Sequence, residues 1–274
     1  MPEREYLDEA EFGLHLVSSD DGRFRALVRD IEQRSQPFAS WAIDDVSNAA
    51  VLLNESGRAI VVLAYVWSYT LANGTSRSSR FANLGSSMQM EILNGRSPVP
   101  QDIGTCILAG SKRLITERGM FGNNLDVLPA DRARNGGSYV GAGGRGAGTT
   151  RTSEQIVSIR LSLDLAIFDN GLCVGPDKSG LLDALTQSLE VQRSTAQNAA
   201  TAIRNGASEG QLFEMLLPWA RRMRSVAPDR HERVLLPMFC RMAIDQLINA
   251  SRPEQLVWFE RLAQPSSLQL HRSM

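Results

Sequence analysis

Residues 157 to 167 alternate without a break between apolar residues and smaller or polar ones. The apolar positions are Val157, Ile159, Leu161, Leu163, Leu165 and Ile167. Because successive side chains of a β-strand point to opposite faces, a period of two predicts a long strand with one buried face and one solvated face. Asp169, Asn170 and Gly171 follow and predict a hairpin turn into another strand at 172–174.

Several other segments show the period of strands. The run from Ala59 to Leu71 has apolar residues on both faces in its first half, which is typical of a strand in the middle of a sheet. Turns rather than helices join these segments, and the pattern of roughly seven or eight strands predicts an antiparallel, immunoglobulin-like β-sandwich. The paired cysteines of antibody domains are absent, so this expectation concerns the architecture alone. The remaining strands are predicted at 46–53, 75–81, 87–92, 103–108 and 112–116.

Segments with apolar residues at helical spacing lie before and after the predicted sandwich in the sequence. Apolar residues at helical spacing predict a short helix over 24–31. Beyond the sandwich, four amphipathic stretches predict a small helical bundle, with Ser179 and Ser208 as N-caps and Pro253 in the first turn of the last helix. We therefore predict an α+β chain with three parts: an N-terminal helical segment and linker at 1–44, a β-sandwich domain at 45–177 and an α-helical domain at 178–274.

Composition argues against several classes of function. Lys and Arg total 29, Asp and Glu total 30, and the formal net charge of −1 gives no long-range attraction for nucleic acid. The sequence has no run of about 18 consecutive apolar residues, so no membrane-spanning helix is predicted. The three cysteines are widely spaced and indicate neither a disulfide framework nor a metal site. The acidic N-terminus lacks the pattern of a secretory signal, so we expect a cytoplasmic protein unless a leader has been removed.

A glycine-rich loop is predicted at about 134–153, and three of its glycines, Gly141, Gly143 and Gly146, match the G-x-G-x-x-G pattern of dinucleotide-binding turns. That turn needs a strand before it and a helix after it, because the helix directs its amide groups at the pyrophosphate. Here the chain after Gly146 leads into a strand, and Arg145 is the only nearby cation. We therefore expect a flexible loop and no bound cofactor, although such a loop can serve as a lid or bind a partner.

The sequence offers no catalytic or metal-binding constellation. His15, His231 and His271 lie in separate segments without the spacing of metal ligands. Cys240 falls in an apolar run without a positive neighbour, which favours a buried structural thiol over a nucleophile. Three aromatic residues could stack on sugars or bases if they faced solvent, but their alternation on an apolar strand favours the core. They are Tyr65, Trp67 and Tyr69.

One group of basic residues is a candidate partner contact. Arg221, Arg222 and Arg224 lie close together near the end of a predicted helix, and Arg145 in the glycine-rich loop is a further candidate. The alternative interpretation is a solvated helix end, because cations near a helix C-terminus complement the helix dipole.

Three segments carry a resemblance to known proteins: NESGRAIVVLAYVWSY at 54–69, AGSKRLIT at 109–116 and LAIFDNGLCVGPD at 165–177. With their order along most of the chain, they resemble uncharacterised bacterial proteins that have an immunoglobulin- or fibronectin-like β-sandwich followed by a helical tail. The resemblance implies that fold and an architectural role for the asparagine-serine-glycine turn and the VGPD junction. It implies no activity, cofactor or catalytic residue.

These observations favour a non-enzymatic binding or scaffold protein whose sandwich loops and helical tail contact protein partners, since rigid sandwiches often display variable loops. An alternative is an enzyme or small-ligand-binding protein with a site in the cleft between the sandwich and the helical bundle. A third hypothesis is a component of a larger assembly in which the glycine-rich loop becomes ordered on contact.

Overall fold

The structure is a computed structural model, and it describes residues 3–34, 49–83, 87–95, 106–116, 119–122, 156–225, 232–266 and 268–273. The chain forms two compact units. The sandwich unit comprises Met1–Asn83, Val99–Pro176 and Leu270–Met274, and the helical unit comprises Leu84–Pro98 and Asp177–Gln269. The chain is therefore of mixed α and β class with mainly antiparallel sheets, as predicted.

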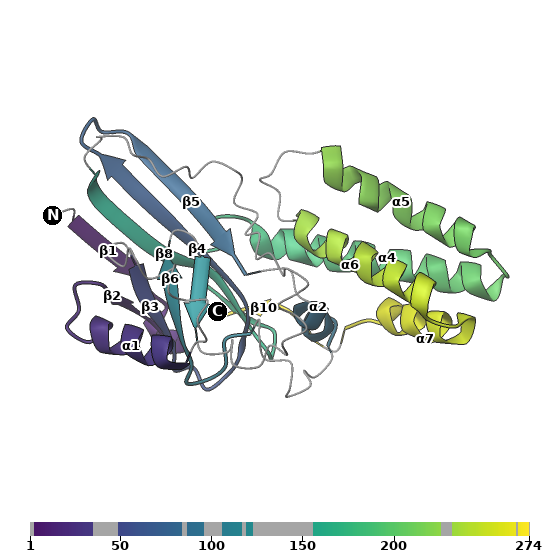
Figure 1. Ribbon diagram of the computed structural model, residues 1–274, viewed down its shortest axis with the longest axis horizontal. Helices are drawn as coiled ribbons and strands as arrows, with labels where there is room; N and C mark the ends of the chain where they lie inside the picture. The colour runs from purple at the N-terminus through teal and green to yellow at the C-terminus, as the bar shows by residue number, and fades with distance from the viewer. Residues whose placement is uncertain are drawn as a thin grey trace. The chain divides into compact units, whose positions relative to one another are not determined.

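Two β-sheets make up the sandwich unit (Figure 1). The six-stranded sheet has the order β10 (His271–Arg272), β9 (Leu172–Val174), β8 (Ile156–Phe168), β4 (Ile60–Leu71) and β5 (Ser76–Ala82), with β1 (Glu3–Leu7) also paired to β8. The four-stranded sheet has the order β2 (Leu14–Ser18), β3 (Ala49–Asn54), β6 (Lys112–Thr116) and β7 (Gly119–Gly122).

Strand β8 lies at the centre of the larger sheet, and both of its edges pair with other strands. Its one edge pairs with β4 in antiparallel orientation from Ile156 to Phe168. Its other edge is divided: β1 pairs in parallel with residues 158–162, and β9 pairs antiparallel with Ala166 and Ile167. The predicted strand at 157–167 is confirmed, and its alternation holds from Ile159 to Leu163. From Asp164 onward both faces are buried, since Asp164 and Ala166 are 2% and 1% exposed, and Val157, predicted to be buried, is exposed.

The two sheets share one apolar core. Leu14, Leu52 and Ile115 of the four-stranded sheet belong to the same buried cluster as residues of β4 and β8. Tyr65 and Trp67 lie in this cluster and are 0% and 1% exposed, so their predicted place in the core is confirmed. A second apolar layer lies between the four-stranded sheet and α1 (Phe24–Arg34), the helix predicted over 24–31 (Figure 1).

The turn after β3 is held by the side chain of Asn54, which is fully buried. Its amide nitrogen lies 2.8–2.9 Å from the carbonyl oxygens of Arg58, Ile107 and Leu108, and its amide oxygen accepts the Ser56 hydroxyl at 2.6 Å. A buried amide must be paired in this way, because an unpaired polar group would keep its full desolvation cost. The asparagine-serine-glycine turn therefore has an architectural role.

The helical unit contains α2 (Ser87–Leu93), α4 (Leu181–Arg204), α5 (Glu209–Ser225), α6 (Glu232–Asn249) and α7 (Arg252–Ala263). The prediction of Ser179 as the first N-cap is wrong. Gly180 occupies the N-cap position in a left-handed conformation, and the carboxylate of Asp177 accepts the backbone N–H groups of Leu181 and Leu182. The capping box at Ser208 and the first-turn proline of α7 are confirmed.

Three features differ from the sequence predictions. The segment at 87–92 is the helix α2 and not a strand, because Met90 and Leu93 are buried at helical spacing. Residues 1–44, predicted to be helical, also contain the strands β1 and β2. The division into units also differs from the predicted domains: Leu84–Pro98 groups with the helices, and Leu270–Met274 groups with the sandwich.

Two glycines with nearly equal backbone conformations allow a test of the packing beside the Asn54 turn. Gly13 has φ +73° and Gly57 has φ +74°, but an added Cβ at Gly13 would lie 2.7 Å from the Ser56 nitrogen, whereas Gly57 has open space. We expect Gly57→Ala to lower the free energy of unfolding by about 1 kcal/mol for backbone strain. Gly13→Ala should lower it by about 3 kcal/mol, because the clash adds an overpacking cost.

The measurement is urea unfolding of the full chain, followed by circular dichroism. Equal losses of stability in the two variants would contradict the close packing of Gly13 against the turn.

Candidate functional site

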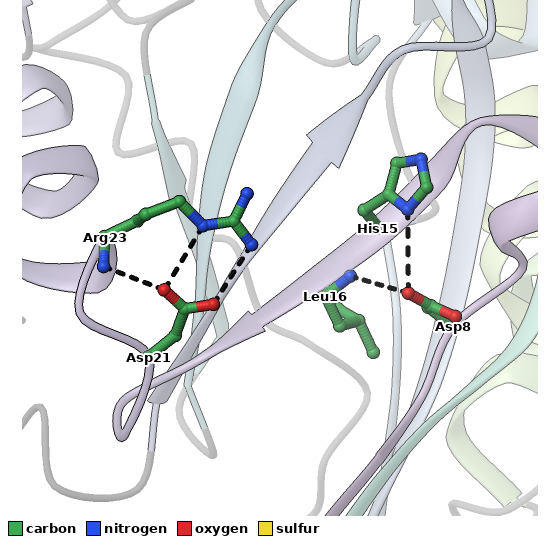
Figure 2. Close-up of polar contacts among 5 residues, drawn as sticks. All are labelled: Asp8, His15, Leu16, Asp21 and Arg23. Atoms are coloured by element: carbon green, nitrogen blue, oxygen red, sulfur yellow. Dashed lines mark hydrogen bonds and ion pairs between the residues drawn. The ribbon is translucent and has the colours of Figure 1, made fainter.

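Two places in the sandwich unit are candidate sites: an acidic hollow beside the N-terminal strands, and the outer edge of β5. The hollow adjoins a polar cluster around His15 in β2 (Figure 2). The Nδ1 atom of His15 lies 3.8 Å from Asp8 Oδ2, and its Nε2 atom lies 3.7 Å from Glu55 Oε2. The Asp8 carboxylate also accepts the backbone N–H of Leu16 at 3.3 Å. These groups are partly exposed, so the contacts between them add little stability.

A second polar contact in Figure 2 belongs to the turn before α1. The Asp21 carboxylate accepts the backbone N–H of Arg23 at 2.8 Å and its guanidinium at 3.0 and 3.2 Å. These hydrogen bonds hold the pKa of Asp21 below its ordinary value. The contact is local and orders the entry into the helix.

The hollow has a volume of about 350 Å³. Phe168, which is 1% exposed, and Phe12 give it apolar surface, while Glu11, Glu55 and Arg58 contribute charged groups. The negative charge of this region also affects Glu9, whose pKa is raised first by burial and then by the nearby Glu11 and Asp8 carboxylates. The complete lining is Glu11, Phe12, Gly13, Glu55, Ser56, Arg58, Phe168 and Leu172.

Three polar residues of this hollow, Glu55, Ser56 and Arg58, make contacts within the protein. Glu55 lies beside His15, Arg58 lies 3.7 Å from Asp169, and the Ser56 hydroxyl donates to Asn54. Within the described part of the chain, no three His, Cys, Asp or Glu side chains are placed to hold a metal ion. The hollow is thus explained by the packing of the Asn54 turn beside the 3-10 helix η1 (Ala10–Phe12).

The outer edge of β5 is the second candidate. This strand ends the six-stranded sheet, and it pairs with β4 over seven residues without a register shift. No strand among the described residues pairs with its other edge. The five residues from Ser76 to Arg80 are all exposed.

The hydrogen bonds of the ladder show which backbone groups face this edge. Leu71 N–H donates to the Thr75 carbonyl, and Asn83 N–H donates to the Leu63 carbonyl. Hydrogen-bonded and non-bonded pairs alternate along an antiparallel ladder, so the odd-numbered residues of β5 direct their backbone groups toward β4. The even-numbered residues, Ser76, Ser78, Arg80 and Ala82, therefore direct their N–H and C=O groups outward.

Among the described residues, the side chains along β5 do not cover this edge. Three serines and two arginines occupy its exposed positions, and its one large apolar residue, Phe81, stacks on Tyr65 with ring centroids 5.0 Å apart. An added strand could thus reach the outward backbone groups without displacing a bulky side chain. Exposed edges of this kind pair with extended segments of other chains.

The residues predicted as a partner contact are not brought to either candidate site by the described structure. Arg145 and the glycine-rich loop lie outside the described residues. Arg221, Arg222 and Arg224 lie on α5, and their side chains are also outside the description. Sequence analysis missed the β5 edge, although a signal existed: SRSSR is a strand with no apolar residue over five positions, which is typical of an edge.

Cys240 lies in α6 and is 2% exposed. Burial raises the pKa of its thiol from 9.0 to about 11. A thiolate is the nucleophilic form of cysteine, and this environment disfavours it at neutral pH. The prediction that this thiol is buried is confirmed.

Comparisons with protein-family models, curated proteins and solved structures give no significant match to this chain. Among the described residues, no helix is both long and apolar enough to span a membrane.

The pKa of Cys240 leads to a prediction about its reactivity. At pH 8 we expect iodoacetamide to alkylate Cys240 in the folded chain at least about a hundredfold more slowly than a free thiol, because so little thiolate is present. The rate should rise as the pH approaches 11, and unfolding in guanidinium chloride should restore ordinary reactivity. Peptide-level mass spectrometry measures the rate at each cysteine, and fast labelling of Cys240 in the folded chain would contradict its burial.

Proposed function

We propose that this chain is a non-enzymatic binding protein whose sandwich unit holds a protein partner by adding one strand of that partner to β5. The observation that supports this proposal is the accessible backbone edge of β5. Main-chain hydrogen bonds provide affinity in this mode of recognition, and the neighbouring side chains provide specificity.

The edge compares favourably with the hollow as a contact surface. Ser76, Ser78, Arg80 and Ala82 together have four N–H donors and four C=O acceptors directed outward. Each hydrogen bond contributes a net of about 0.5–1.5 kcal/mol, and an extended segment loses conformational freedom when it binds. We therefore expect dissociation constants of about 10–100 μM for short peptides.

Other parts of the proposal rest on the sequence. The sandwich is proposed to be immunoglobulin-like, for which the support is two mainly antiparallel sheets with one shared core. The helical unit, with the arginines of α5, is proposed as a second contact surface. A cytoplasmic location is also proposed, for which the support is three widely spaced cysteines that indicate no disulfide framework. The alternative function, an enzyme or small-ligand-binding protein with a site between the two units, stays a hypothesis.

Substitution of Ser78 tests strand addition at β5. Ser78→Pro removes an N–H that faces the open edge, so it should leave the β4–β5 ladder intact and weaken the binding of any added strand at least about tenfold. Ser78→Ala keeps the N–H and should bind as the original chain does. The probes are peptides selected from a random phage-displayed library against the full chain, and their affinities are measured by isothermal titration calorimetry.

Ser79→Pro serves as the structural comparison for these variants. The Ser79 N–H faces β4, so this substitution should destabilise the fold, whereas Ser78→Pro should unfold near the temperature of Ser78→Ala. Selected peptides that bind Ser78→Pro as tightly as Ser78→Ala would refute strand addition at this edge.

A further inference from the structure

We infer that the segment bound at β5 runs antiparallel to this strand and places an aromatic side chain against Phe81. This inference rests on the proposed function, because it concerns the partner of the same edge. It follows from a row of core residues that continues across the sheet to its edge.

The row crosses three neighbouring strands. Leu163 of β8 is paired with Tyr65 of β4, and Tyr65 is paired with Phe81 of β5. Side chains of directly paired residues share a face, so all three point toward the core, where Leu163 and Tyr65 are 2% and 0% exposed. Phe81 packs against the same core but is only partly buried, and no described strand lies beside it. The row therefore ends with an apolar ring at the edge of the sheet.

The ring of Phe81 rests on a fixed neighbour. It stacks on Tyr65 with ring centroids 5.0 Å apart and an interplanar angle of 25°. Tyr65 is fully buried, and its hydroxyl donates to the Thr116 carbonyl at 3.4 Å. An incoming side chain thus meets a preformed apolar surface, which reduces the cost of ordering on this side of the contact.

The ladder predicts how close an added residue comes to Phe81. The odd-numbered residues of β5 direct their backbone groups toward β4. An antiparallel strand on the outer edge therefore bonds to the even-numbered residues and meets Phe81 in a non-hydrogen-bonded pair. Cα atoms in such a pair are about 4.5 Å apart, against about 5.5 Å in a hydrogen-bonded pair, so the side chains lie closer. Aromatic pairs across strands add to the apolar area that they bury, so an aromatic residue is the favoured neighbour.

Phe81 also sets the register of the bound segment. The exposed positions of β5, from Ser76 to Arg80, are all polar, so Phe81 is the one place along this strand where a large apolar side chain gains a partner of its own kind. In an antiparallel segment, the residues after the aromatic one run from Arg80 toward Ser76. The aromatic residue is therefore expected near the N-terminal end of the bound segment.

A second copy of this chain does not supply such a side chain. Pairing two β5 strands along their full length places Ser79 opposite Ser79 and Phe81 opposite Arg77 of the second copy. A pairing with Phe81 opposite Phe81 would join only residues 80–82 of each strand. A partner segment with its own aromatic residue can pair along the whole edge, and this makes it the more favourable occupant.

The test compares two synthetic peptides with blocked ends, and their affinities for the full chain are measured by isothermal titration calorimetry. The first, Thr-Phe-Thr-Thr-Thr-Gln-Thr, has its phenylalanine opposite Phe81 when the peptide covers residues 76–82. The second has alanine in place of the phenylalanine. We expect the first peptide to bind about tenfold more tightly, because its ring buries apolar area against Phe81.

Variants of the chain connect this preference to Phe81. Phe81→Ala should reduce the tenfold preference to about twofold, and Phe81→Leu, which keeps an apolar side chain, should reduce it to about fivefold. Arg80→Ala is the matched control: its side chain lies on the opposite face, so the preference should stay at about tenfold. Circular dichroism and thermal unfolding establish that the variants are folded. A preference of about tenfold in both Phe81 variants would place the peptide ring elsewhere and overturn the inference.

The outcomes separate this inference from the proposed function. If both peptides bind equally and both lose binding on Ser78→Pro, strand addition stands and the aromatic pairing is wrong. The aromatic pairing is also wrong if neither peptide binds at about 1 mM, ten times the weakest dissociation constant expected, while library-selected peptides still lose binding on Ser78→Pro. If the selected peptides are insensitive to Ser78→Pro, the proposed function fails as well. A dimer of the full chain in sedimentation equilibrium that dissociates on Ser78→Pro would assign the edge to a second copy and overturn the inference.

Discussion

The pairing of β4 with β8 is the interaction on which the sandwich unit depends. The two strands pair along their lengths, and β4 is buried on both faces in its first half, where Val61, Val62 and Leu63 have no exposed surface. Since β8 also holds β1 and β9 on its other edge, it can accept no further strand. Among the described strands, only β5 extends the sheet past β4. The outer edge of β5 therefore has no partner strand in the described part of the chain.

An exposed edge is a hazard that a chain must limit, because its unpaired backbone groups can pair with any other strand. Strand β5 is polar over the first five of its seven residues, and charged side chains on an edge strand oppose pairing between copies.

The sequence predicted the elements whose side-chain period is unambiguous. The strand at 157–167 alternates over eleven positions, and the helix at 24–31 has one clear stripe, so both were identified. In shorter segments, the side-chain period does not distinguish a strand from a helix. In 87–92, Met88, Met90 and Ile92 alternate like a strand, yet Met90 and Leu93 also fit a helix. In β1, the inward-facing residue Arg4 is charged, so the sequence shows no alternation of apolar and polar residues there. Arg4 is tolerated at this position because it pairs with Asp20, 16 positions away, at 2.6 Å.

The edge position of β5 could not be predicted from the sequence for a related reason. Whether a strand lies at an edge depends on which strands pair, and pairings such as β4 with β8 join residues about 100 positions apart, a separation that local periodicity does not encode. The five polar residues of SRSSR were compatible with an edge, but they were equally compatible with a solvated strand under a loop. Only the ladder identifies Ser76, Ser78 and Arg80 as the residues with outward backbone groups.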